Sequence, residues 1–509
     1  AWSALGGQAN AGAGVKIAVL DTGVDETHPG LKDSAMKAPA GYPRSGNADD
    51  ALHTTGKVIV ARSFVAALAN GYGTPESSRP DDLSARDRVG HGTAVAMIAA
   101  GALHTSPLGS ISGVAPKAWL GNYKIFGSPG VNDSTTADVA LTALEWAFKD
   151  GMDVAILASG DPPSLWSPED QGATCGQPAG AACDPWAAAV SAALKSGMAV
   201  VAAAGNRGEA GLHTIASPAN VTDAIAVGAT SNSHTVAAAL ITPAGDRLAL
   251  RFSDGPQPGG AFTAPMIPAA AVSGAEYGCA AFPAGSLAGK VVLMSDGFCS
   301  YSAKVLNAWA AGAAAAIVFP LATGGTLGSP IGLENTGIPS AQISNASGVY
   351  LRGYLAANPN ARVTLDPTKA ETGAATVDAV APFSSRGPGT QGLGIKPDLA
   401  APGVSIYTAA QNLDPNGDLY SASRYVGVDG TSFAAAFAGG AAALVKQAHP
   451  GWTASQIKSA LVNTASGAVI DGSGAARTTA VGAGRLDIAA AVKTTVTVEP
   501  SSISFGAIG

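Results

Sequence analysis

The sequence predicts an α/β fold in which helices cover both faces of a mostly parallel sheet. Short apolar runs rich in β-branched residues, such as 15–20, alternate with segments of helical period, such as 136–149. The runs are apolar throughout, as in strands that are buried on both faces. Strands and helices that alternate along a chain indicate a parallel sheet with helices on its two faces.

The expected elements follow a regular order. Along the first 230 residues we predict strands at 15–20, 120–126, 154–157 and 199–204, and helices at 93–102, 136–149 and 185–196. The same texture returns at Phe383, with helices predicted at 432–447 and 454–463. Because ligands of such a sheet bind at the carboxyl ends of its strands, residues that follow the strands are the first candidates for a functional site.

Residues 231–381 have a different texture, rich in Gly, Pro and short β-like runs. Within them we predict strands at 290–294 and 316–319, with a helix at 302–311 between the two. The sequence therefore predicts one domain in two parts, a β-rich insertion, and the first strand of a further β domain that the chain does not complete. In order along the chain, these are 1–230, 231–381, 382–493 and 494–509.

Composition excludes several classes of protein. Charged residues make up 13% of the 509 residues, against about 25% in average proteins, and 47% are hydrophobic, which excludes a disordered chain. A net charge of −7 without basic clusters argues against nucleic acid as a partner. The apolar runs are too short or too Gly-broken for the roughly 18–20 residues of a membrane span.

Four cysteines lack the close C-x-x-C spacing of zinc sites and redox motifs. Two local disulfides would fit a secreted protein, but four cysteines allow three connectivities. The disulfide candidates are Cys175, Cys183, Cys279 and Cys299.

Three short segments carry the candidate chemistry. Asp21 follows an apolar strand, His91 stands between two glycines at the start of a small-residue helix, and Ser432 opens an Ala-rich helix. Taken singly, Asp21 reads as a turn residue and Ser432 as a helix cap, and His91 reads equally well as a capping residue. Taken together they can form a nucleophilic site, because a serine needs a histidine base that a buried carboxylate orients.

Asn206 completes this set. It follows the apolar strand predicted at 199–204, and its side-chain amide could donate to an oxyanion beside the backbone N–H of Ser432. The chain order Asp, His, Ser is the order found in subtilisin.

With these motifs in place, the sequence resembles the subtilisin-family (subtilase) serine peptidases over roughly 10–230 and 380–490. Further matching segments are 114–116 (VAP), 225–229 (IAVGA), 383–388 (FSSRGP) and 396–403 (KPDLAAPG). The resemblance implies a subtilisin-like fold with Ser432 as nucleophile, His91 as general base, Asp21 orienting His91, and Asn206 in the oxyanion hole. It also implies hydrolysis of peptide bonds through an acyl-enzyme.

The insertion has a resemblance of its own. Segments 289–294, 299–301 and 308–318 are similar to a protease-associated domain, as in cucumisin-like plant enzymes and bacterial extracellular relatives. The tail from Thr494 resembles the start of the fibronectin-like domain that often follows. For the insertion, an influence on substrate access or subunit contacts and a rigid structural role are equally open.

By motif position, two segments are expected to pair with the backbone of an extended peptide. Their candidate residues are Ser128, Gly130, Ala158, Ser159 and Gly160. At the second segment the family usually has Asn-x-Ser-Leu-Gly, so the smaller Ala158 and Ser159 could open the pocket. Because no charged residue lies in these segments, we expect uncharged or apolar side chains before the cut.

Neither a metal nor a cofactor is expected. Gly30 follows His28-Pro29, where bacterial subtilisins place a calcium-binding carboxylate, and Tyr425 stands where a calcium loop from Asp414 would need Glu.

The sequence therefore predicts a secreted serine endopeptidase acting on protein or peptide substrates, of undetermined oligomeric state. Two alternatives are a non-catalytic surface protein that binds peptides and a lipase- or esterase-type hydrolase. The second class expects a Gly-x-Ser-x-Gly elbow, which the sequence lacks.

Overall fold

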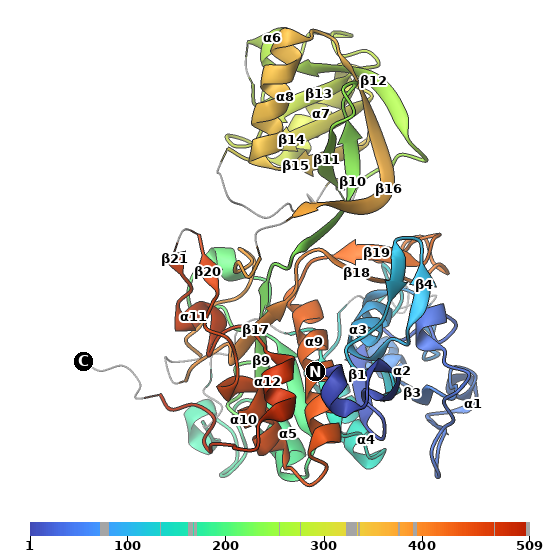
Figure 1. Cartoon of the computed structure of the whole chain (residues 1–509), viewed down its shortest axis with the longest axis vertical. Helices are drawn as coiled ribbons and strands as arrows, with labels where there is room; N and C mark the ends of the chain where they lie inside the picture. The colour runs from blue at the N-terminus through green and yellow to red at the C-terminus, as the bar shows by residue number, and fades with distance from the viewer. Residues whose placement is uncertain are drawn as a thin grey trace. The chain divides into compact units, whose positions relative to one another are not determined.

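The computed structural model describes residues 1–71, 81–132, 134–160, 166, 170–253, 255–274, 276–321, 333, 336–374, 377–389, 394–472 and 474–504. The chain divides into two compact units (Figure 1). The first unit combines Ala1–Asn232 with Thr376–Gly509, and the second is Ser233–Ala375. The second unit lies within the residues 231–381 that the sequence sets apart.

The first unit is built on an eight-stranded sheet in which every neighbouring pair of strands runs parallel. This confirms the predicted fold class. In spatial order the strands are β17 (Leu399–Pro402), β9 (Ile225–Thr230), β8 (Ala199–Ala203), β7 (Val154–Leu157), β1 (Lys16–Asp21), β6 (Trp119–Lys124), β3 (Val58–Ser63) and β2 (Arg44–Ser45).

Helices cover both faces of this sheet, because successive strand residues enter two different cores. Ile17 and Val19 of β1 pack with α3 (His91–Ala100), α9 (Thr431–Ala448) and α10 (Ala454–Asn463). Ala18 and Leu20 of the same strand pack with α4 (Ala137–Lys149) and α5 (Pro185–Lys195). Shorter helices are α1 (Ala48–Ala51), α2 (Val65–Gly71), α11 (Thr478–Val481) and α12 (Ile488–Lys493).

Three two-stranded ribbons complete the first unit. They pair β4 (His104–Ser106) with β5 (Gly109–Ile111), β18 (Ile406–Ala409) with β19 (Tyr425–Val428), and β20 (Ile470–Asp471) with β21 (Gly474–Ala475). The tail does not join them: residues 494–504, predicted as the start of a strand, form no strand, and 505–509 lie outside the described residues.

The second unit is a closed barrel with two longer helices, α7 (Tyr301–Ala310) and α8 (Asn345–Ala357), and a short one, α6 (Ala270–Ser273). Its strands, in order around the barrel, are β10 (His234–Ile241), β11 (Arg247–Phe252), β15 (Ser340–Ile343), β14 (Ala315–Phe319), β13 (Val291–Ser295), β12 (Phe262–Pro268) and β16 (Arg362–Ala374). Strands β13 and β14 and helix α7 lie within two residues of the bounds predicted from the sequence.

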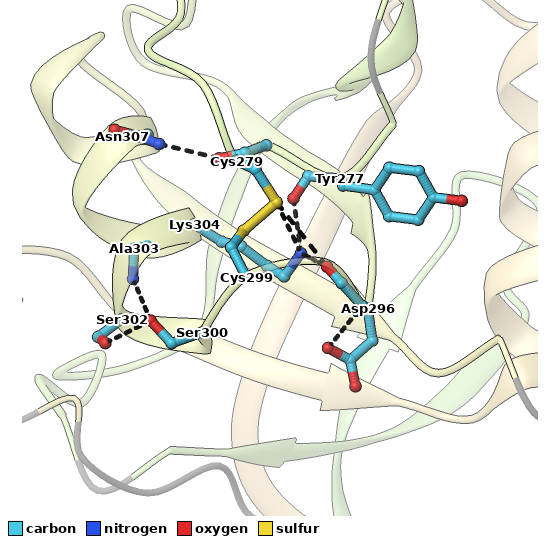
Figure 2. Close-up of a disulfide and its surroundings, with 11 residues drawn as sticks. Tyr277, Cys279, Asp296, Cys299, Ser300, Ser302, Ala303, Lys304 and Asn307 are labelled. Carbon is cyan, nitrogen blue, oxygen red and sulfur yellow. Dashed lines mark hydrogen bonds between the residues drawn. A yellow bond between two sulfur atoms is a disulfide. The ribbon is translucent and has the colours of Figure 1, made fainter.

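Both disulfides are local: Cys175 pairs with Cys183, and Cys279 pairs with Cys299. Figure 2 shows the Cys279–Cys299 disulfide beside Lys304, whose side chain is fully buried. The ammonium group of Lys304 donates to the carbonyls of Tyr277 at 2.8 Å and Gly297 at 2.7 Å. Lys304 therefore fastens together the same two loops that the disulfide links.

A buried ion-pair cluster supports the sheet edge at β17. Asp398 lies 2.8 Å from the ammonium of Lys396 and 2.9 Å from that of Lys458, and it accepts the N–H of Ala226 on β9 at 2.8 Å. Burial lowers the pKa of Lys396 to about 8, although the Asp398 charge opposes that shift. A carboxylate here offsets two buried cations.

Asp398→Asn is expected to destabilise the first unit by about 3–5 kcal/mol, because it leaves two buried ammonium groups without their counter-charge. Urea unfolding of the whole chain measures the loss. Asp49→Asn, which removes an exposed carboxylate from α1, is the matched control. A loss below about 1 kcal/mol for Asp398→Asn, within the range of surface ion pairs, would contradict the expectation.

Candidate active site

Asp21 and His91 form a close pair. Asp21 is the last residue of β1 and is 1% exposed, and His91 is the first residue of α3. The Nδ1 atom of His91 lies 2.8 and 3.0 Å from the two carboxylate oxygens of Asp21. Because a carboxylate only accepts, Nδ1 carries the proton and Nε2 is the free base.

Glycines allow this approach of helix to strand. Gly90, which precedes the helix, has a φ of +101°, a conformation that suits glycine. Gly92 has no space for a side chain, since a Cβ there would lie 2.1 Å from the carbonyl oxygen of Gly23 and 3.0 Å from the Cβ of Asp21. The helix begins at His91 itself, two residues before the start predicted from the sequence.

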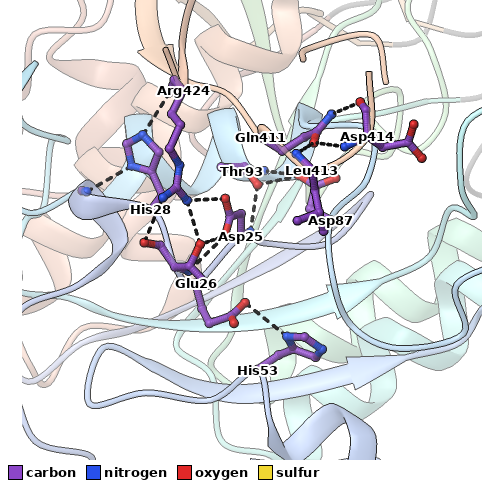
Figure 3. Close-up of polar contacts among 12 residues, drawn as sticks. Asp25, Glu26, His28, His53, Asp87, Thr93, Gln411, Leu413, Asp414 and Arg424 are labelled. Carbon is purple, nitrogen blue, oxygen red and sulfur yellow. Dashed lines mark hydrogen bonds and ion pairs between the residues drawn. The ribbon is translucent and has the colours of Figure 1, made fainter. Parts of the chain in front are cut away.

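Asp87 is a buried carboxylate that links the residue after Asp21 to the start of the helix that carries His91 (Figure 3). One of its oxygens accepts from the hydroxyl of Thr22 at 3.0 Å and from the N–H groups of Val89 and Gly90 at 3.0 and 2.7 Å. The other accepts from the N–H and hydroxyl of Thr93 at 3.0 and 2.6 Å. Sequence reasoning missed Asp87, because several aspartates stand close together at 81–87 and no pattern distinguishes this one.

Charge around His91 sets its protonation. Burial lowers the pKa of His91, but the charges of Asp21, Asp87 and Asp418 outweigh burial and raise the pKa above its ordinary value of 6.5. The aromatic ring of Phe433, the residue after Ser432, packs 5.3 Å from the imidazole between ring centres. The position of Phe433 was also not predicted.

Ser432 is the second residue of α9 and is 8% exposed. Its hydroxyl donates to the carbonyl oxygen of Ala158. The Ser432 hydroxyl therefore does not donate to His91 in this structure, although Ser432 and His91 line the same cleft. Hydrogen bonds of catalytic groups in free enzymes often form fully only when substrate binds.

Asn206 follows β8 and is held by the residue before Ser432. Its side-chain oxygen accepts the N–H and the hydroxyl of Thr431 at 3.0 and 2.9 Å. The same hydroxyl accepts the N–H of Gly205 at 3.1 Å. With its oxygen bonded in this way, Asn206 has its NH₂ group left to donate.

The cleft has a volume of about 570 Å³ and brings most of the predicted residues together. Among the residues that line it are Asp21, His91, Ser432, Gly130, Ala158, Ser159 and Gly160. Ser128 is not among these lining residues: it is buried, donates its N–H to Asp81 at 2.8 Å, and accepts the N–H of Asp82 at 3.1 Å on its hydroxyl. Asn206 reaches the site through Thr431 and is not itself among the lining residues.

A smaller pocket of about 200 Å³ adjoins the cleft and shares Phe126, Ser159 and Gly160 with it. Its other lining residues are uncharged: Ser134, Thr135, Ala140, Leu157, Trp186, Ser217 and Pro218. Within the described part of the chain, no group of three or more His, Cys, Asp or Glu side chains is placed to hold a metal ion.

A parallel α/β sheet with this site at its strand ends defines a subtilisin-like protein. The Peptidase_S8 family model, described as the subtilase family, matches residues 12–487, and the chain belongs to that family. Among solved structures, the psychrophilic subtilisin-like protease Apa1 from the Antarctic psychrotroph Pseudoalteromonas sp. AS-11 shares the fold, with a TM-score of 0.51 at 18% identity over 95% of this chain and 94% of that one.

Curated relatives are similar along nearly the whole chain. The minor extracellular protease Vpr of Bacillus subtilis (strain 168) is 30% identical over 97% of this chain and 53% of its own length. The subtilisin-like protease SBT1.2 of Arabidopsis thaliana is 29% identical over 94% of this chain and 62% of its own length. The chain thus spans between half and two thirds of the length of these relatives. Among the described residues, no helix is both long and apolar enough to cross a membrane.

Proposed function

We propose that this protein is a serine endopeptidase that cleaves protein or peptide substrates at the cleft holding Asp21, His91 and Ser432. The observation that carries the proposal is the buried Asp21–His91 pair beside a serine in one cleft. Membership of the subtilase family supports it.

In the proposed reaction, the Ser432 hydroxyl turns from the Ala158 carbonyl toward Nε2 of His91, which takes its proton as the oxygen attacks the peptide carbonyl. Asp21 stabilises the imidazolium that forms. The NH₂ group of Asn206 and the backbone N–H of Ser432 donate to the oxyanion. His91 then protonates the leaving amine, and water releases the acyl group from Ser432 by the same path.

Substrate would lie along the lining segments at 127–130 and 158–160, pairing with their backbone. The uncharged pocket of about 200 Å³ beside Ser159 is the proposed site for the side chain before the cut. A charged side chain there would be buried without a partner, which costs free energy. We therefore propose a preference for uncharged side chains at this position, which cleavage of a mixed peptide library measures.

Labelling with a serine-directed phosphonofluoridate tests the catalytic assignment. The wild-type chain is expected to gain one covalent adduct on Ser432, and Ser432→Ala is expected to gain none. Ser423→Ala, which changes a serine outside the cleft lining, is the matched control and should label like wild type. A wild-type chain that is not labelled would favour a non-catalytic peptide-binding protein instead.

The protonation of His91 is expected to set the acid limb of the pH profile, which is the fall of kcat/KM at low pH. Because its pKa is raised, His91 remains protonated up to a higher pH, and the neutral base is lost as the pH falls through that raised pKa. We expect log(kcat/KM) plotted against pH to bend at a pH above 6.5. Enzyme incubated at each pH and returned to neutral pH controls for unfolding, and a bend at or below 6.5 would contradict the prediction.

We further propose that the protein acts outside the cell and that the second unit is a protease-associated domain. The protein has two disulfides, one in each unit, and disulfides persist in oxidising compartments. The relative from Bacillus subtilis is named as a minor extracellular protease. Expression of the full-length protein in its native host, followed by assay of the culture medium, tests the location.

A further inference from the structure

A loop between β18 and β19 forms part of the cleft lining, and no catalytic motif includes it. Near its start the loop is held by Gln411, whose side chain is fully buried. The Gln411 side-chain oxygen accepts the N–H groups of Leu413 and Asp414 at 2.6 and 2.8 Å, and its NH₂ donates to the Asp414 carbonyl at 2.7 Å (Figure 3).

The loop is also fastened farther along. The N–H of Leu419 donates to the carbonyl of Val89, two residues before His91, at 2.9 Å. Near its end, Arg424 forms an ion pair with Asp25, which lies shortly after β1 (Figure 3). These contacts hold residues 416–418 beside the start of α3.

Two loop residues, Asn416 and Asp418, line the cleft that contains His91 and Ser432. Asp418 is exposed. Among the described residues that line the cleft there is no Lys or Arg.

The other acidic residue of the lining, Asp21, is buried and engaged with His91. Among the described residues that line the cleft, Asp418 is thus the exposed acidic group. Its charge acts on the catalytic histidine, because Asp418 is one of the three carboxylates that raise the pKa of His91, with Asp21 and Asp87.

We propose that Asp418 is a specificity-determining residue that makes the cleft favour peptides with a Lys or Arg side chain at the position facing the 416–418 loop. This inference rests on the proposed function and deepens it. The cleft would then bind two chemically different side chains of the substrate, an uncharged one in the pocket at Ser159 and a cationic one beside His91.

Matched fluorogenic peptides test the proposal. The peptides differ at one position, carrying Lys, the uncharged isostere norleucine, or Glu, and each position on either side of the cut is varied in turn. At the position facing Asp418, wild-type enzyme is expected to favour Lys over norleucine by about two- to fivefold in kcat/KM at low ionic strength, as for an exposed ion pair. The preference should fall in 1 M salt, where the screening length is about 3 Å.

Three variants decide the outcome. Asp418→Asn should bring the Lys-to-norleucine ratio to about one, and Asp418→Lys should reverse the preference toward Glu. Asp49→Asn, with the same loss of charge outside the cleft lining, should keep the wild-type ratio. As an independent readout, Asp418→Asn should move the acid limb of norleucine-peptide cleavage to lower pH, because one of the carboxylates that raise the pKa of His91 is gone.

Unchanged Lys-to-norleucine ratios in both Asp418 variants would overturn the inference, even if the acid limb moves, because Asp418 would then act on His91 without contacting substrate. Such an enzyme would still cleave peptides and label at Ser432, so the proposed function would stand. A wild-type chain that neither cleaves nor labels overturns the proposed function and this inference together.

Discussion

Ser432→Ala is expected to lower kcat about 10⁶-fold while leaving the fold intact. The variant removes the atom that forms the covalent bond, so the Asp21–His91 pair has no nucleophile to activate. The residual rate would come from substrate binding and from the donors at Asn206 and the α9 backbone, which act without the serine. Steady-state cleavage of an uncharged fluorogenic peptide measures the loss.

Thermal unfolding provides the control for this variant. Because the Ser432 hydroxyl makes a hydrogen bond to the Ala158 carbonyl, its loss should cost about 1 kcal/mol of stability and no more. Retention of more than about one hundredth of wild-type kcat, with contaminating protease excluded by labelling, would contradict Ser432 as the nucleophile.

Asp21→Asn is expected to lower kcat about 10⁴-fold. One oxygen of Asp21 accepts both from Nδ1 of His91 at 2.8 Å and from the N–H of Thr22 at 2.7 Å. If the asparagine oxygen keeps the bond to Thr22, its NH₂ group faces Nδ1. The imidazole then places its proton on Nε2, which can no longer take the proton of Ser432.

Asp153→Asn is a matched control, because Asp153 accepts the backbone N–H of Lys16 at the opposite end of β1. It should retain wild-type kcat. The acid limb of Asp21→Asn should also move to lower pH, since Asp21 is the strongest influence that raises the pKa of His91. A kcat within tenfold of wild type for Asp21→Asn would show that the carboxylate does not set the tautomer of His91.

Short-range patterns were sufficient for the elements that carry the site. The apolar run at 15–20 predicted β1, which the structure places one residue later, at Lys16–Asp21. The helix that carries Ser432 was predicted within one residue at each end, because its many alanines favour a helix. Its two adjacent glycines oppose that preference, and packing against β8 and β9 adds support that the local sequence does not carry. The alternation of strands and helices was enough to predict the parallel sheet.

Contacts between distant segments could not be predicted in this way. Asp87 holds Thr22 across 65 residues, and nothing in the sequence around Asp87 indicates that partner. The hydroxyl of Ser128, a predicted substrate-binding residue, accepts the backbone N–H of Asp82, 46 residues away, and no pattern in the sequence indicates that partner. Such side-chain choices depend on which loops meet at the sheet edge.

The sequence by itself determined the class of this protein, because residue type and order are sufficient to specify a parallel sheet with Asp and Asn at strand ends and His and Ser at helix starts. Only the tertiary structure decided how these groups are held and what surrounds them. Hydrogen bonds and charges act over a few ångströms in space, and chain folding alone brings the 416–418 loop, Asp87 and Phe433 within that range of His91.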